Sequence, residues 1–254
     1  MAALNFVGAM HYVVQGWRLV RRPGLRRFVW IPLIINILVF AGLGWLFFSA
    51  VADWFANITF LHRLQEIPLI GWVFTLLQWL FGAVVIVLML FFFSLLANLI
   101  GAPFNGLLSE RTEQYLNGKL HDNESTLQSL IKTIPSTLSS ELRKLLYLVL
   151  WLVPLFIAHW IPGLNLIAPF LLFAFGAWMF GLEYLDYPMG NRGMGFGKVR
   201  KHLKQHRQTT LGFGFAVSVL SAVPLLNLFI MPVAVAGATA LYVEHLQHEI
   251  EANY

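Results

Sequence analysis

The chain has 254 residues, of which 58% are hydrophobic and only 11% are charged, and its formal net charge at pH 7 is +5. A soluble domain carries about 25% charged residues, so this composition excludes a water-soluble globule and predicts an all-α integral membrane protein forming a single membrane domain. The absence of cysteine excludes disulfides, thiolate metal sites and cysteine nucleophiles.

The N-terminal segment, residues 1–27, combines an amphipathic stretch with a basic one. Within residues 4–17, apolar side chains recur at helical spacing on one face, at positions 4, 7, 10, 14 and 17. We expect this stretch to form a helix that lies along the membrane surface before the first span.

Two uncharged blocks follow, at residues 28–52 and 67–109, and each is predicted to cross the bilayer. The first block is long enough for a hydrocarbon core of about 30 Å. Only residues 72–100 of the second need lie in lipid, and Gly101-Ala102-Pro103 is expected to interrupt its helix. Residues 110–144 are predicted to be a polar, partly amphipathic helical segment on the cytoplasmic side.

Two further apolar blocks, residues 145–182 and 208–243, resemble each other. Both contain a break of the form Pro-x-Leu-Asn-Leu, at residues 162–166 and 224–228, so we interpret them as repeated helical hairpins. Each arm would hold about 15–19 residues, which is at or below the length of a membrane span. The blocks are therefore either four short spans or two re-entrant hairpins that enter the bilayer without crossing it.

The basic residues indicate how these elements are oriented. Residues 183–207 are expected to form a basic loop between the hairpins, and residues 244–254 form a tail without Lys or Arg. If each hairpin returns to its starting side, 16 of the 17 Lys and Arg residues share one face, with Arg63 as the exception. By the positive-inside rule that face is cytoplasmic.

The segment Arg21–Arg27, where the first span begins, is the strongest candidate for a binding site. The first N–H groups of a helix have no internal partner and carry partial positive charge. Gly24 would let a ligand approach the backbone closely, and Arg26 and Arg27 offer guanidinium donors suited to a tetrahedral oxyanion. The segment is therefore either a sulfate or phosphate site or a run of arginines that only sets the topology.

Three motifs in the chain resemble the CysZ sulfate permease family: residues 24–36, residues 102–105 leading into 108–110, and residues 183–189. The resemblance covers nearly the whole chain. It implies a bacterial inner-membrane protein that admits sulfate for assimilation into cysteine, with two long transmembrane helices and two hemi-penetrating hairpins, in oligomers. It thereby favours the re-entrant interpretation of the hairpins.

The resemblance also implies which residues bind sulfate. The Gly-Leu-Arg motif of the family corresponds to Gly24, Leu25 and Arg26, with Arg27 included because it is adjacent. No catalytic residue, cofactor or metal is expected. The expected partners are sulfate, membrane lipid and further copies of the chain, and nucleic acid is not expected.

Polar residues in or beside the apolar blocks are candidates for lining a pore. The alternative for each is a turn cap, a contact between helices or a structural ion-pair network. The candidates are Asn36, Asn98, Asn105, Ser109, Glu110 and Arg111.

A glycine-rich segment and two pairs of histidines are interpreted as structural features rather than as binding sites. The glycine-rich residues 190–198 lack the residues of a nucleotide-binding loop and are expected to be a flexible cytoplasmic loop, followed by a basic run that could meet anionic headgroups. His245 and His248 have helical spacing but are assigned to a solvated helix end, and His202 and His206 are expected at the surface.

The function favoured by these observations is a sulfate permease that acts as a channel or facilitator. A membrane scaffold without transport activity is the alternative, because a pore and a packed bundle have similar compositions. A membrane-embedded lipid enzyme is disfavoured, because the apolar blocks contain His159 as their only ionisable residue.

Overall fold

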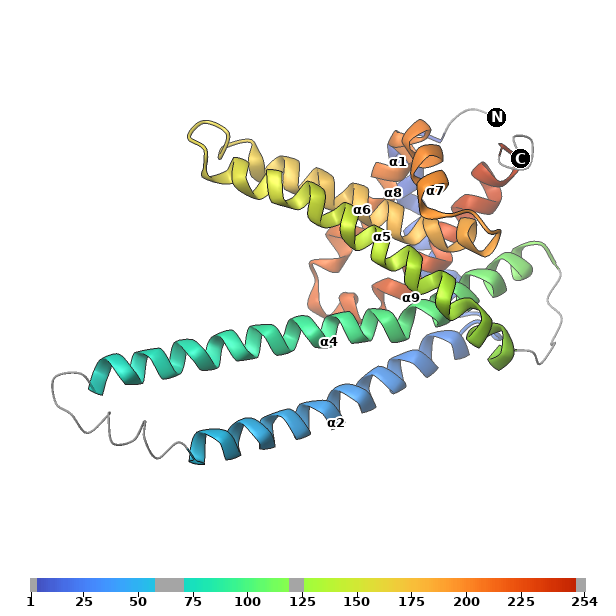
Figure 1. The fold of residues 1–254 in the computed structure, drawn as a ribbon. Coiled ribbons are helices and arrows are strands. Elements are labelled where there is room, and N and C mark those ends of the chain that lie inside the picture. Colours follow the sequence, from blue (N-terminus) through green and yellow to red (C-terminus); the bar gives the residue numbers. More distant parts are fainter. Residues whose placement is uncertain (1–3, 58–70, 119–125, 250–254) are drawn as a thin grey trace. The chain divides into compact units, whose positions relative to one another are not determined.

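The computed structural model describes residues 4–57, 71–118 and 126–249, and all regular structure in these residues is helical (Figure 1). The all-α prediction is therefore confirmed. The elements are α1 (Phe6–Leu19), α2 (Arg27–Asn57), α4 (Gly71–Leu116), α5 (Thr126–Trp160), α6 (Ala168–Asn191), α7 (Phe196–Gln205), α8 (Arg207–Ser221), α9 (Pro224–Leu241) and a short π-helix, η1 (Tyr242–Leu246).

The chain divides into two compact units, whose boundaries fall inside two of the helices. The smaller unit is residues 31–101, and the larger unit comprises residues 1–30 and 102–254.

The smaller unit contains most of α2 and the first part of α4, which contact each other through Phe40 and Phe93, with ring centroids 5.3 Å apart. Both helices expose large apolar side chains around their circumference, among them Trp45 and Trp79. A helix that is apolar on all sides requires lipid or protein around it. Each helix contains a 23-residue stretch that is long and apolar enough to cross a membrane, as the sequence predicted.

The predicted interruption at residues 101–103 is wrong, because α4 continues through Pro103 to Leu116. A proline removes one backbone hydrogen bond from a helix, and membrane helices tolerate this loss. Beyond the proline, tertiary packing holds the chain helical: Asn105, Leu108 and Thr112 lie on one face of α4, and all three are buried in the larger unit.

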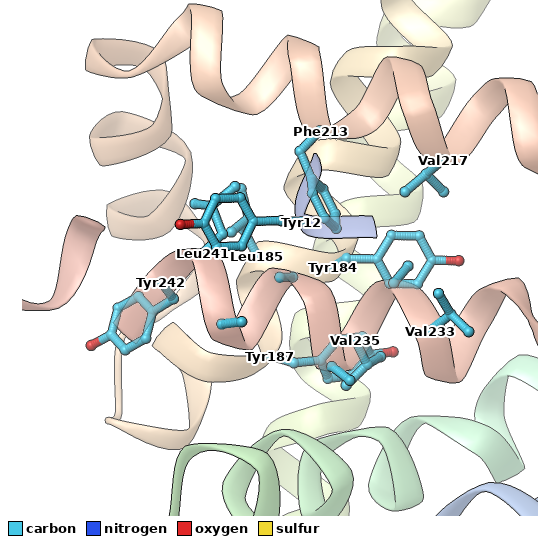
Figure 2. Packing of buried hydrophobic residues seen from close by; sticks show 14 of the residues in the cluster. Tyr12, Tyr184, Leu185, Tyr187, Phe213, Val217, Val233, Val235, Leu241 and Tyr242 are labelled. Atoms are coloured by element: carbon cyan, nitrogen blue, oxygen red, sulfur yellow. The ribbon is translucent and has the colours of Figure 1, made fainter. Parts of the chain in front are cut away.

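The core of the larger unit is formed mainly by α1, α6, α8 and α9. Figure 2 shows side chains of these four helices gathered around one another. The buried side chains include Val13 from α1, Leu185 from α6, Phe213 from α8, and Val235 and Leu241 from α9.

Glycines let these helices approach closely. A Cβ atom at Gly16 of α1 would lie 2.1 Å from the carbonyl oxygen of Val233 in α9. A Cβ atom at Gly214 of α8 would lie 1.8 Å from the carbonyl oxygen of Ala177 in α6. Small residues at such crossings are the usual means by which membrane helices pack, so these glycines are structural requirements of the core.

The N-terminal amphipathic stretch is helical as predicted, but α1 buries a different face from the expected apolar stripe. The buried residues are Ala9, Tyr12, Val13, Gly16 and Leu19, while Val7 and Val14 are exposed. The small residues on the buried face allow α8 and α9 to pack directly against the backbone of α1.

The two hairpins are α5–α6 and α8–α9. The arms of the first are longer than predicted, because α5 begins at Thr126 and α6 continues to Asn191. The prediction of a loop at residues 183–207 is wrong, since only a short turn separates α6 from α7. Helix α7 forms because Phe196, Val199 and Leu203 are spaced to share one face, which is buried.

The Pro-x-Leu-Asn-Leu motifs adopt different local structures in the two hairpins. Residues 162–166 form consecutive turns before α6, with Gly163 at a φ of 87°. The matching position in the second hairpin is Leu225, and a side chain disfavours positive φ. The chain therefore turns just before Pro224, which becomes the first residue of α9.

Candidate anion site and buried ion-pair cluster

The candidate anion site occupies the corner between α1 and α2. Leu25, Phe28 and Val29 of this corner are buried in the core of the larger unit. Trp17 and Trp30 both pack edge-on against Phe229 of α9, with ring centroids 6.3 Å and 6.1 Å apart. The corner is therefore anchored by apolar contacts, and its backbone has a defined shape.

Gly24 has a φ of 91°, in the region that disfavours residues with a side chain. A Cβ atom built on Gly24 would have no heavy atom within 4 Å. Glycine is thus required here by the turn rather than by crowding, and the space beside its backbone is open to a ligand.

The prediction of unpaired amides in this corner is wrong for Leu25 and Arg26. Both amides donate to the carbonyl oxygen of Arg22, over 3.1 Å and 3.3 Å. The turns that lead into α2 satisfy these groups internally. An anion at this corner would therefore depend mainly on the arginine side chains.

The guanidinium groups of the corner are exposed. Arg21 lies over the ring of Trp17, with its Cζ 5.1 Å from the ring centroid, and Arg27 lies at the same distance over Phe28. Among the residues that the structure describes, Arg22 and Arg26 form no ion pair with a carboxylate. The resulting positive potential can attract an anion to the corner.

The predicted pore residues do not form one cluster. Asn36 belongs to the smaller unit, where it lines a small pocket with Val39, Phe40, Leu43, Phe93 and Leu96. Its Oδ1 is buried and has no hydrogen-bond partner within the described part of the chain. Asn98 is in α4, but its side chain lies outside the described residues.

The other predicted pore residues make contacts within the larger unit. Asn105 is buried, and its Nδ2 donates to the hydroxyl of Tyr187 over 3.4 Å. The hydroxyls of Ser109 and Thr239 lie 2.9 Å apart. Glu110 and Arg111 contact Gln114 within α4. These contacts match the structural alternative considered for each residue, and a role in lining a pore stays a prediction.

A buried cluster of charges lies at the base of the α5–α6 hairpin. The Lys144 side chain is only 4% exposed, and its Nζ lies 2.8 Å from Glu141, 3.1 Å from Glu183 and 3.0 Å from Asp186. One ammonium group thus forms ion pairs with three carboxylates. Burying charges costs free energy unless they are paired in this way.

The cluster extends to Asn105 and Ser140. The Tyr187 hydroxyl donates to Glu183 over 3.3 Å and accepts from Asn105, and Ser140 donates to Asp186 over 3.3 Å. Of these residues, only Asn105 was among the predicted site residues. The fold-back at residues 162–163 was the available signal, because Lys144 precedes Gly163 by 19 residues and Glu183 follows it by 20.

A second polar contact joins α1 to the π-helix. The Tyr12 hydroxyl donates to Glu244 over 2.5 Å and lies 2.8 Å from Nε2 of His245, and Gln15 donates to Glu244 over 2.9 Å. Burial, followed by the hydrogen bond to Glu244, raises the pKa of Tyr12. Tyr12 therefore stays a hydrogen-bond donor at physiological pH.

The expectation that His202 and His206 lie at the surface is wrong in part, because both residues are partly buried. The Nε2 atom of His202 is buried, and the side chain of His206 is only 14% exposed and pairs with Glu249. The physical cause is that helix α7 is amphipathic. Its two histidine rings lie near Glu249, at the end of the described chain, while its basic side chains are exposed.

Comparisons with known proteins agree with the resemblance noted in the motifs. The model of a family described as "Sulfate transporter CysZ/Etoposide-induced protein 2.4" matches residues 12–232, from α1 into α9. The chain is 40% identical to the "Sulfate transporter CysZ" of Pectobacterium atrosepticum over 247 residues, which are 94% of this chain and 86% of that protein. The chain is thus a member of the sulfate transporter CysZ family.

Proposed function

We propose that this protein carries sulfate across the bacterial inner membrane for assimilation into cysteine. Family membership supports this function, together with the similarity to the sulfate transporter CysZ of Pectobacterium atrosepticum. The helices of spanning length and composition support a multi-pass membrane protein.

Sulfate binds at the corner formed by Gly24, Leu25, Arg26 and Arg27 in this proposal. The observation that carries it is a set of exposed guanidinium groups around an open glycine, in a corner anchored by the buried side chain of Leu25. Sulfate only accepts hydrogen bonds, and guanidinium groups only donate them, so the two are chemically matched. Leu25 acts here by positioning the backbone, because its side chain is buried.

The translocation path requires several copies of the chain. One chain supplies two long helices and two hairpins, which are too few elements to enclose an aqueous pore, so we propose a homo-oligomer embedded in lipid. The unpartnered amide oxygen of Asn36 is a candidate contact along the path. In this proposal the arginine corner lies at the cytoplasmic end of α2, as the positive-inside rule predicts.

The test is sulfate flux in liposomes that contain the purified protein. The double variant Arg26→Glu/Arg27→Glu is compared with Lys201→Glu/Lys204→Glu, a control with the same change of charge at exposed positions of α7. Labelled sulfate should enter liposomes with the wild type and the control, while the corner variant should bind and carry at least about tenfold less.

Two results would contradict parts of this proposal separately. Unchanged flux in a folded Arg26→Glu/Arg27→Glu variant would remove the proposed site while leaving transport intact. No flux through the wild-type protein would favour the scaffold alternative, and release of lipid products by the purified protein would favour an enzyme.

A further inference from the structure

Helix α7 brings two histidines to one glutamate near the end of the described chain. His202 and His206 lie one helical turn apart on α7, and Glu249 follows η1. Nε2 of His206 lies 2.9 Å from Oε2 of Glu249. One ligand atom from each of the three residues lies within 4.8 Å of the other two.

The contact between His206 and Glu249 leaves Nε2 of His202 without a partner among the described residues. Nε2 of His202 is buried and has no hydrogen-bond partner in the part of the chain that the structure describes. Its ring lies 4.9 Å from that of His206, centroid to centroid, at an angle of 40°. A buried ring nitrogen without a partner is uncommon in folded proteins and calls for an explanation.

We propose that His202, His206 and Glu249 bind a divalent transition-metal ion, with Zn²⁺ as the expected occupant. Two imidazole nitrogens and a carboxylate oxygen are a known ligand set for zinc, with water or an anion in the fourth position. Nitrogen ligands favour zinc and its neighbours over Mg²⁺ or Ca²⁺, which prefer oxygen.

The geometry is compatible with such a site after small side-chain rotations. Zn–N and Zn–O distances of about 2.0–2.2 Å place tetrahedral ligand atoms about 3.3–3.6 Å apart. The separation of up to 4.8 Å in the structure must therefore close by somewhat more than about 1 Å. Glu249 is 44% exposed, so its carboxylate can move toward the two histidines without disturbing the core.

The charges and burial around the site influence its expected affinity for a metal ion. Lys198, Arg200, Lys201 and Lys204 are exposed on α7 and weaken the attraction of any cation. Burial, followed by the nearby His206, lowers the pKa of His202, which favours the neutral ring, the form that binds metal. The metal would link α7 to the chain that follows α9, and we therefore expect it to stabilise this part of the larger unit.

The test is Zn²⁺ titration of the full chain in detergent, purified without a histidine tag and followed by calorimetry. The wild type should bind one Zn²⁺ per chain and no Mg²⁺ at the same concentration. His202→Gln, His206→Gln and Glu249→Gln should each weaken Zn²⁺ binding about tenfold or more. The controls His248→Gln, next to Glu249, and His11→Gln, on α1, should bind as the wild type does.

Thermal unfolding gives a second measurement. Zn²⁺ should raise the melting temperature of the wild type and of both controls, but not that of the three ligand variants. Absence of Zn²⁺ binding by the wild type would overturn the proposal, as would wild-type affinity in His206→Gln and Glu249→Gln. The melting temperature of each variant without metal identifies any variant that does not fold. If His202→Gln does not fold, the variants at His206 and Glu249, which are partly exposed, still decide the test.

Discussion

Replacing Lys144 by methionine tests the role of the buried charge cluster most directly. Methionine keeps an unbranched chain of similar length but removes the ammonium group. Glu141, Glu183 and Asp186 would then remain together without the cation that lies within 3.1 Å of each. Removing one partner of a buried ion pair typically costs about 3–5 kcal/mol, because the remaining charge is left uncompensated.

The expected effect is large enough to measure by thermal unfolding in detergent. For a chain of this size, about 1 kcal/mol corresponds to about 2–4 °C in melting temperature, so Lys144→Met should lower it by about 6–20 °C. Arg143→Met is the matched control, because Arg143 is the exposed neighbour of Lys144 on α5. This control should change the melting temperature by no more than about 2 °C.

A second variant separates charge from packing. In Lys144→Met/Glu183→Gln/Asp186→Asn, two of the three carboxylates become neutral while the side chains keep their shapes. Because the loss in Lys144→Met is attributed to unpaired negative charge, the triple variant should recover at least half of it. Equal melting of Lys144→Met and Arg143→Met would refute this reasoning, as would a triple variant no more stable than Lys144→Met.

Three further substitutions test the helix contacts, the pocket in the smaller unit and the anion corner. Gly214→Ala places a Cβ atom 1.8 Å from the carbonyl oxygen of Ala177 and should cost about 1–3 kcal/mol, whereas Gly176→Ala, where nothing lies within 4 Å, should leave the melting temperature unchanged or higher. Asn36→Leu removes a buried amide oxygen that has no partner, so it should stabilise the protein by about 1–3 kcal/mol. Lower sulfate flux in this more stable variant would assign Asn36 to the transport path. A lower melting temperature of the variant would contradict the reasoning. Gly24→Ala forces a side chain into a φ of 91° and should cost about 1–2 kcal/mol while weakening sulfate binding, and unchanged binding would show that the shape of the corner is unimportant.

The long helices could be predicted because their signal is local. Uncharged blocks of spanning length define α2 and α4 by composition alone. Their ends were harder to predict, since Pro103 is a helix breaker by local rules and yet lies inside α4. What keeps α4 helical there is the burial of Leu108 and Thr112 against other parts of the larger unit, and a local pattern does not report such packing.

The polar clusters depend on contacts between distant segments. Lys144 and Glu183 meet because the chain folds back at Gly163, so a predicted hairpin could have paired them by counting from its tip. The proximity of His206 to Glu249 had no comparable signal. It depends on how α7 and η1 pack in the larger unit. No predicted turn joins these two helices, so counting residues from a turn could not have paired them.

The tip of the α5–α6 hairpin bears on whether the hairpin crosses the membrane. Trp160, Leu166 and Phe170 surround the tip, and each is at least 74% exposed in the single chain. A turn that emerged on the far side would place these large apolar groups in water. The amides of Leu164 and Asn165 both donate to the carbonyl oxygen of Ile161, over 3.1 Å, so the turn satisfies these two groups internally, which an apolar medium favours.

A tip of this kind should remain within the bilayer, and cysteine labelling can test it. The chain has no cysteine, so Leu164→Cys introduces a single thiol at the tip. In intact cells, a membrane-impermeant maleimide should leave this thiol unmodified while it labels Asp53→Cys, near the end of α2 opposite the arginine corner. Arg207→Cys, in the basic region that the positive-inside rule predicts to be cytoplasmic, should also be unlabelled until the cells are opened. Labelling of Leu164→Cys as complete as that of Asp53→Cys would mean that the hairpin crosses the membrane, and the exposed apolar tip would then need a protein partner outside the bilayer.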